Sequence, residues 1–87
     1  MHVVVRGRVQ GVGFRWFVRE AARRLDLAGW VRNNPDGSVD VAAEGEAEAL
    51  NALRAKLQKG PAGAGVSSVD DTAAVDGPLD RPFTVLK

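Results

Sequence analysis

Residues 7–15, Gly-Arg-Val-Gln-Gly-Val-Gly-Phe-Arg, stand where the hydrophobic periodicity of the chain changes from that of a strand to that of a helix. Before this stretch, Val3 and Val5 share one face of a strand expected over His2–Val9. After it, apolar residues recur at helical spacing, which predicts a helix over residues 14–26. The stretch is therefore a glycine-rich turn that joins a strand to the N-terminus of a helix.

The remaining elements follow from periodicity and from turn residues. Asn34-Pro35-Asp36-Gly37 has the composition of a tight turn, and it predicts a hairpin between the two runs that flank it. A second amphipathic helix is expected over about Glu46 to Lys59, where Gly60-Pro61 ends it. The predicted strands after the first are Ala28–Asn33, Ser38–Glu44, Val66–Val75 and a short Phe83–Leu86.

The predicted order of elements is β-α-β-β-α-β, with a possible fifth strand. This order is typical of the ferredoxin-like split βαβ sandwich, an α+β fold. We expect a four- to five-stranded antiparallel sheet with two helices on one face. A length of 87 residues suits one small domain over residues 1–87.

The glycine-rich turn has features of an anion site. Glycines let consecutive backbone N–H groups point into one concavity, and the positive end of a helix adds to the attraction. Arg15 falls in the first helical turn, where its guanidinium is able to grip phosphate oxygens in a fork. The stretch is neither a Walker loop nor a dinucleotide fingerprint, and a tight turn with an ordinary surface arginine remains the alternative. The candidate phosphate-binding residues are Gln10, Gly11, Val12, Gly13, Phe14 and Arg15.

The expected topology brings Asn33 to the same edge of the sheet as this turn. The first two strands of a split βαβ run the same way, so the end of Ala28–Asn33 lies near the N-terminus of the first helix. Asn33 shares a face with Val31, the expected core residue, by strand alternation. An asparagine offers a donor and an acceptor, which suits the binding of a water molecule. The alternative is that Asn33 only begins the following turn.

The charge of the chain is uneven. The net charge is +1, but in residues 1–32 seven arginines against Glu20 and Asp26 give +5, and the remainder carries −4. One end of the molecule should attract anions, although the total is too small for strong non-specific binding of nucleic acid. No apolar run is long enough to cross a membrane, and the absence of cysteine excludes disulfides and fits the cytoplasm.

The residues now quoted resemble a known family. Gly7–Arg15, followed by Gly29-Trp30-Val31-Arg32-Asn33 with the asparagine eighteen positions after Arg15, closely resembles the acylphosphatases. The resemblance runs through nearly the whole chain and includes the turn at 34–37, the helix ending at Lys59-Gly60-Pro61, and Phe83. The chain departs from many relatives in its last residues, Thr84-Val85-Leu86-Lys87, and in the glycines of the segment 61–66.

The resemblance implies hydrolysis of carboxyl–phosphate anhydrides without metal or cofactor. It implies that Arg15 binds phosphate, that Asn33 positions the attacking water and that the Gln10–Arg15 backbone cradles the phosphate. The implied partner is a small acyl phosphate, with inorganic phosphate or sulfate as a competing anion. We expect a monomer that binds neither nucleic acid nor membrane, and we expect no catalytic role for His2, at the far end of its strand.

Two other interpretations remain open from the sequence. One is a non-catalytic ferredoxin-like binding module that recognises RNA or a small-molecule effector. Trp30 is a candidate stacking platform for RNA, but the neighbouring strand, Ser38–Glu44, offers no second aromatic residue. The other is a stand-alone relative of the acylphosphatase-like domain of larger maturation proteins, with little activity of its own.

Overall fold

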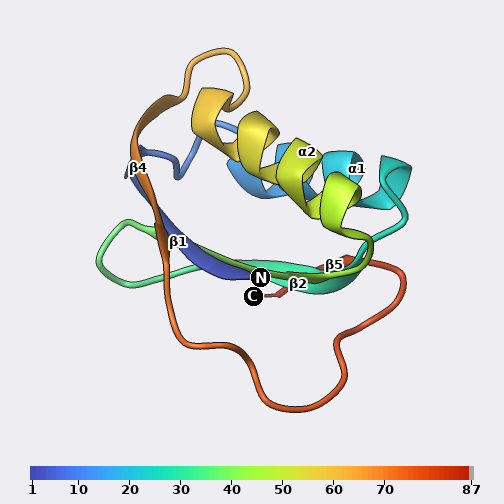
Figure 1. Ribbon diagram of the computed structural model, residues 1–87. Helices are drawn as coiled ribbons and strands as arrows, with labels where there is room; N and C mark the ends of the chain where they lie inside the picture. The colour runs from blue at the N-terminus through green and yellow to red at the C-terminus, as the bar shows by residue number, and fades with distance from the viewer. Residues whose placement is uncertain (87) are drawn as a thin grey trace.

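A five-stranded sheet carries two helices on one face over residues 1–86, which the computed structural model describes (Figure 1). The chain runs from the sheet into a helix and back twice, as the sequence predicts. The long segment after the fourth strand hangs on the other side of the sheet before the chain returns to it (Figure 1). The elements are β1 (His2–Arg8), α1 (Phe14–Arg24), β2 (Ala28–Asn33), β3 (Val39–Glu44), α2 (Ala47–Lys59), β4 (Gly65–Asp71) and β5 (Thr84–Val85).

The strands lie in the order β4-β1-β3-β2-β5. β1 and β2 both pair antiparallel with β3, so they run in the same direction and their ends meet at one edge. β5 pairs with β2 in parallel, with Val31 opposite Val85, so the sheet is mixed and the expectation of an antiparallel sheet throughout is wrong. The predicted α+β ferredoxin-like architecture is confirmed.

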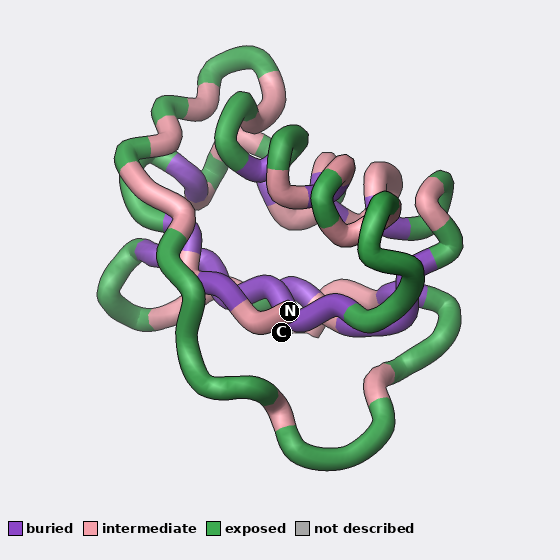
Figure 2. Tube along the Cα trace, in the orientation of Figure 1, coloured by how far each residue is buried: buried purple, intermediate pink, exposed green. Residues whose placement is uncertain are grey.

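The hydrophobic core lies between the sheet and the helices, where buried residues line the facing surfaces of both layers (Figure 2). The face predicted for the first strand is confirmed, because Val3 and Val5 are fully buried, and their partners on β3, Val41 and Val39, are fully buried beside them. The helices add three residues of α1 spaced by four positions and two leucines of α2, since only one stripe of each helix faces the sheet. These are Phe14, Val18, Ala22, Leu53 and Leu57.

The fourth strand is shorter than the sequence predicts. Its last paired residue is Asp71, opposite Val3, whereas the alternation of apolar residues predicts a strand that continues to Val75. β4 lies at the edge of the sheet and pairs only with β1. Because the two strands are antiparallel, the end of β4 lies opposite the start of β1, and beyond His2 no earlier residue of β1 is left to pair with it. The bond from the Thr72 N–H to the His2 carbonyl, at 2.9 Å, is the last between them outside the strand pairing.

Candidate active site

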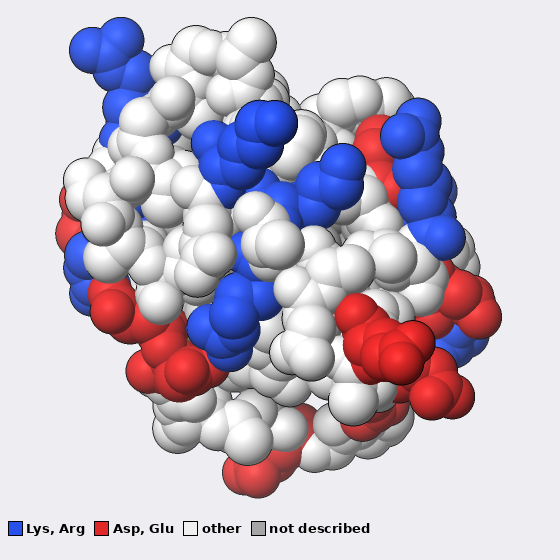
Figure 3. Space-filling model, turned by 45° about the horizontal axis from the view of Figure 1, so that its top comes forward, with Lys and Arg blue, Asp and Glu red and all other residues white. Residues whose placement is uncertain are grey.

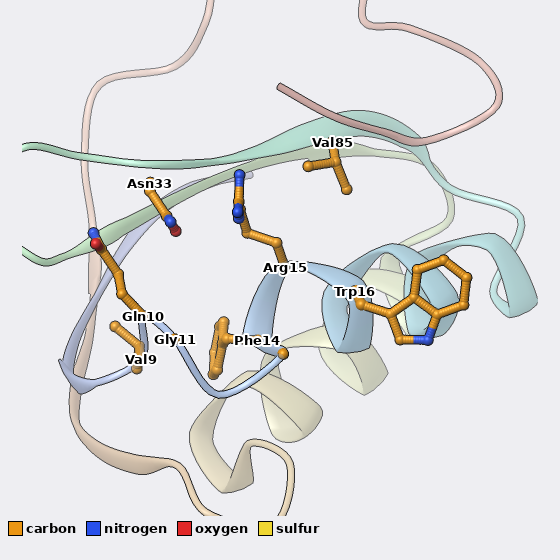
Figure 4. A pocket seen from close by; sticks show the side chains of 9 residues that line it. Val9, Gln10, Gly11, Phe14, Arg15, Trp16, Asn33 and Val85 are labelled. Carbon is orange, nitrogen blue, oxygen red and sulfur yellow. The ribbon is translucent and has the colours of Figure 1, made fainter. Parts of the chain in front are cut away.

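A pocket of about 420 Å³ opens where β1 leads into α1, beside the end of β2 (Figure 4). It brings together most of the residues singled out in the sequence, from segments that are far apart along the chain. From the glycine-rich turn come Gln10, Gly11, Gly13, Phe14 and Arg15, with Val9 and Trp16 on either side. Asn33 of β2 and Val85 of β5 complete the lining.

The backbone of the turn is shaped by two glycines. Gly11 and Gly13 have φ of 75° and 74°, in the left-handed region that other residues rarely adopt. A Cβ at either position would meet nothing within 4 Å, so their role is conformational and the space above them is open. Gly13 also precedes α1, and none of residues 1–86 caps this helix with a side chain. The first N–H groups of a helix lack intrahelical partners, so they suit an anion in the pocket.

Arg15 extends from the first turn of α1 toward the sheet. Figure 4 shows its guanidinium between Asn33 and Val85. The residue is half-buried, although it stands in the first turn of the helix. No carboxylate of residues 1–86 forms an ion pair with Arg15, whereas Arg6, Arg19, Arg32, Arg54 and Arg81 each have such a partner. Within the described chain, its charge is therefore available to an anion.

The Asn33 side chain points from β2 toward the turn (Figure 4). The predicted faces of β2 are confirmed, since Val31 is fully buried while Trp30 and Arg32 lie on the opposite face of the sheet. The Oδ1 atom of Asn33 is buried, and no donor within residues 1–86 bonds to it. A buried acceptor without a partner is unfavourable, so it is a natural place for a bound water or ligand.

Gln10 fastens the turn to the β2–β3 hairpin. Its Nε2 atom donates hydrogen bonds of 2.9 Å to the carbonyl oxygens of Asn34 and Ser38. These contacts fix the distance between the turn and the strand that carries Asn33. The sequence identifies Gln10 only as part of the turn, because bonds across 24 and 28 positions leave no local signal.

The hairpin end that receives Gln10 is itself held by Asp36. Its Oδ1 atom accepts hydrogen bonds from the Ser38 hydroxyl, at 2.6 Å, and from the Ser38 N–H, at 3.0 Å. These bonds favour the ionised carboxylate, so they lower the pKa of Asp36 below its ordinary value of 3.8. Asp36 therefore stays ionised near neutral pH, and its hydrogen bonds from Ser38, which hold the hairpin that follows Asn33, do not change there.

Several other residues lie away from the pocket. Val12 lines a separate groove between the helices and is the one residue of the predicted phosphate-binding turn that does not line the pocket. His2 lies on the opposite face of the sheet, where its Nδ1 is 2.7 Å from the Ala73 carbonyl and its ring contacts Trp30 edge-on. The Arg32 guanidinium lies 5.0 Å from the centre of the Trp30 ring. Trp30 is thus already packed between neighbours and presents no open stacking platform.

The charge of the surface is unevenly distributed. Figure 3 shows Lys and Arg side chains across the upper and central parts of one face, and acidic side chains mainly toward its lower and right-hand edges. Residues 1–86 contain no group of three or more histidine, aspartate or glutamate side chains placed to hold a metal ion. Over the same residues, no helix has the length and apolarity that a membrane span requires.

The fold and the pocket define a class: a small α+β domain with a pocket at the strand-to-helix turn. The acylphosphatase family model matches residues 1–84. The acylphosphatase of Nitratidesulfovibrio vulgaris is 52% identical over 81 residues, which cover 91% of this chain and 81% of that protein. The crystal structure of acylphosphatase from Bacillus subtilis is 39% identical, with a TM-score of 0.85, and covers 99% of this chain and 96% of that one.

The chain belongs to the acylphosphatase family. It acts as an acylphosphatase, a hydrolase of carboxyl–phosphate anhydrides, and its substrate is a small acyl phosphate. The structure of HypF from T. kodakarensis is also similar, at 32% identity and a TM-score of 0.86. That match covers 99% of this chain but 11% of HypF, so the same fold also forms part of a much longer protein.

Proposed function

We propose that the glycine-rich turn and Arg15 hold the phosphoryl group of the acyl phosphate while Asn33 holds the attacking water. The single observation that supports this most is the pocket itself, which places the turn, Arg15 and the unbonded Oδ1 of Asn33 around one space. The turn residues assigned to the phosphate are Gln10, Gly11, Val12, Gly13, Phe14 and Arg15, which act chiefly through backbone N–H groups.

The chemistry needs position and charge stabilisation more than acid or base catalysis. The water oxygen attacks phosphorus, and the bond from phosphorus to the acyl oxygen breaks with its electron pair on the carboxylate. A carboxylate is stable at neutral pH, so no acid has to protonate the leaving group. A phosphate oxygen takes the proton of the water, which leaves a carboxylate and inorganic phosphate. Arg15 and the N–H groups stabilise the phosphoryl oxygens throughout.

The hydrolysis of benzoyl phosphate, followed by the loss of its absorbance, tests this proposal directly. Turnover by the purified chain supports it, and turnover that survives the loss of Arg15 contradicts the assignment of the site. The same assay separates an active enzyme from a stand-alone relative with little activity. The RNA-binding alternative loses its candidate stacking platform, because Trp30 is packed between His2 and Arg32.

We also propose that the protein works as a cytoplasmic monomer without metal or cofactor and binds no nucleic acid. Arg15 supplies the positive charge that a metal ion supplies in other phosphoryl-transfer sites. The residues that we assign to the phosphate and to the water all belong to the same chain, so the proposed chemistry calls for no second copy. Sedimentation at assay concentrations tests the monomer, and a complex that is more active than the single chain would contradict it.

Inorganic phosphate and sulfate are expected to inhibit competitively against benzoyl phosphate. Both anions fit the space above Gly11 and Gly13 and match the charge of Arg15. The measurement is the initial rate at several anion concentrations, with chloride at equal ionic strength as the control. Purely non-competitive inhibition, or a crystal soaked in sulfate with no anion at the turn, would contradict the proposed cradle.

Turnover is expected to vary little between about pH 5.5 and pH 7.5, apart from the ionisation of the substrate phosphate near pH ~6. The proposal assigns no carboxylate and no histidine to the chemical step, so no side-chain acid or base has to be in a particular protonation state. The lowered pKa of Asp36 keeps its carboxylate ionised here. The stability that its hydrogen bonds from Ser38 give to the hairpin is therefore lost only in acid, as the pH falls below 3.8.

Two controls accompany this pH profile. His2→Ala is expected to match the parent enzyme, since His2 lies on the other face of the sheet. EDTA is expected to have no effect on the rate. A bell-shaped profile that changes in His2→Ala, or activity lost to EDTA and restored by magnesium, would show that an acid–base residue or a metal site takes part.

A further inference from the structure

Trp16 is a large apolar side chain left exposed beside the pocket. Its relative exposure is 61%, and no other large hydrophobic residue within residues 1–86 is as open to solvent. It follows Arg15 in the chain and lines both the pocket and the neighbouring groove between the helices. An exposed indole next to an anion site offers a flat apolar surface to any group attached to that anion.

The orientation of this indole is held from one side. The Arg19 guanidinium lies 4.6 Å from the centre of the Trp16 ring, and Glu20 holds Arg19 through a 3.1 Å ion pair. This contact restrains the ring before any ligand arrives, which reduces the entropy lost on binding.

Val85 forms the second apolar surface. β5 is held against β2 by the parallel pairing of Val31 with Val85 and by a 2.8 Å bond from the Leu86 N–H to the Val31 carbonyl. Arg23 of α1 donates from Nε to the Phe83 carbonyl at 2.8 Å, which ties the start of β5 to the helix. Val85 therefore faces the pocket from a fixed strand.

The in-line geometry of phosphoryl transfer places the leaving group on the side of Arg15 where Trp16 and Val85 lie. In phosphoryl transfer the attacking and leaving oxygens lie roughly in line through phosphorus. Figure 4 shows Asn33 on one side of Arg15, and Val85 and Trp16 on the other. If Asn33 holds the water, the acyl group extends away from Asn33, toward Trp16 and Val85.

We infer that Trp16 and Val85 form an acyl subsite that binds apolar, and above all aromatic, acyl groups. This inference rests on the proposed roles of Arg15 and Asn33. It assigns the substrate class as acyl phosphates whose acyl part is a flat apolar group. The acyl group contacts the subsite before and during the reaction, so the subsite lowers KM and leaves kcat nearly constant.

Kinetics with two substrates test the subsite. In Trp16→Ala, the KM for benzoyl phosphate is expected to rise about tenfold relative to that for acetyl phosphate, with similar kcat, since an aromatic contact is lost. Trp16→Phe should largely restore the preference, and Trp30→Phe is the matched control that should keep it. Equal changes for both substrates in Trp16→Ala would show a structural role only and would overturn the subsite.

A binding measurement separates this inference from the proposed function. The chain has two tryptophans, so Trp30→Phe leaves Trp16 as the single reporter of fluorescence. Benzoylphosphonate, which cannot be hydrolysed as an anhydride, is expected to change the emission of this variant, whereas inorganic phosphate at inhibiting concentration is not. In Trp16→Phe, which retains Trp30, the emission should stay constant.

The outcomes of this titration are distinct. If benzoylphosphonate inhibits no better than phosphate and leaves the Trp16 emission unchanged, the acyl subsite is wrong while the phosphate cradle stands. If neither compound inhibits, the proposed phosphate site fails, and the acyl subsite fails with it.

Discussion

Arg15→Ala is expected to lower kcat/KM for benzoyl phosphate by at least about 1000-fold, because the guanidinium is the only side-chain cation among residues 1–86 that lines the pocket. This loss corresponds to about 4 kcal/mol of transition-state stabilisation. The fold should persist, since no ion pair to residues 1–86 is broken and the residue is only half-buried. Steady-state kinetics together with thermal unfolding followed by circular dichroism provide the measurement.

The conservative variant decides whether the geometry of the guanidinium matters. Arg15→Lys keeps the charge but loses the planar pair of donors, so it should recover only a small part of the activity. Arg24→Ala is the matched control, since it removes an exposed arginine from the same helix at its other end, and it should retain parent activity. Near-normal turnover by Arg15→Lys would refute the paired hydrogen bonds of the guanidinium and leave only a role for its positive charge.

Asn33→Ala is expected to lower kcat by about 100-fold while inhibition by phosphate stays nearly constant, because misplacing the attacking water affects the transition state. The free energy of unfolding should fall little, since the Oδ1 atom of Asn33 is buried without a donor from residues 1–86. Removing an unsatisfied buried acceptor costs no hydrogen bond. Rates, phosphate inhibition constants and urea unfolding are the three measurements.

A matched control and a contrary result define this test. Asn51→Ala removes an exposed asparagine of α2 and should leave all three quantities unchanged. If phosphate inhibition weakens in parallel with kcat in Asn33→Ala, then Asn33 is a ligand of the phosphate rather than of the water. A large loss of stability would instead show that the carboxamide supports the hairpin.

The sequence by itself determined the layers of the fold and much of the site. The alternation around Val3 and Val5 and the helical spacing from Phe14 select which faces are buried, since burial of apolar area is the main favourable term in folding. The glycines and Arg15 are neighbours in the chain, so their joint presence at the helix start is a local property. The position of Asn33 at the same edge as the turn followed from the topology, in which the first two strands run in the same direction, and needed no knowledge of contacts between them.

The tertiary structure decided what depends on contacts across the sheet. β4 ends at Asp71 because β1 offers no further partner, and β5 joins the sheet parallel to β2, with Val85 opposite Val31. Gln10 reaches the hairpin carbonyls, and Val85 reaches the pocket beside Trp16, only after the strands have taken their order. Hydrogen bonds and packing between residues far apart in the chain leave no periodic pattern, so only the assembled sheet brings these groups together.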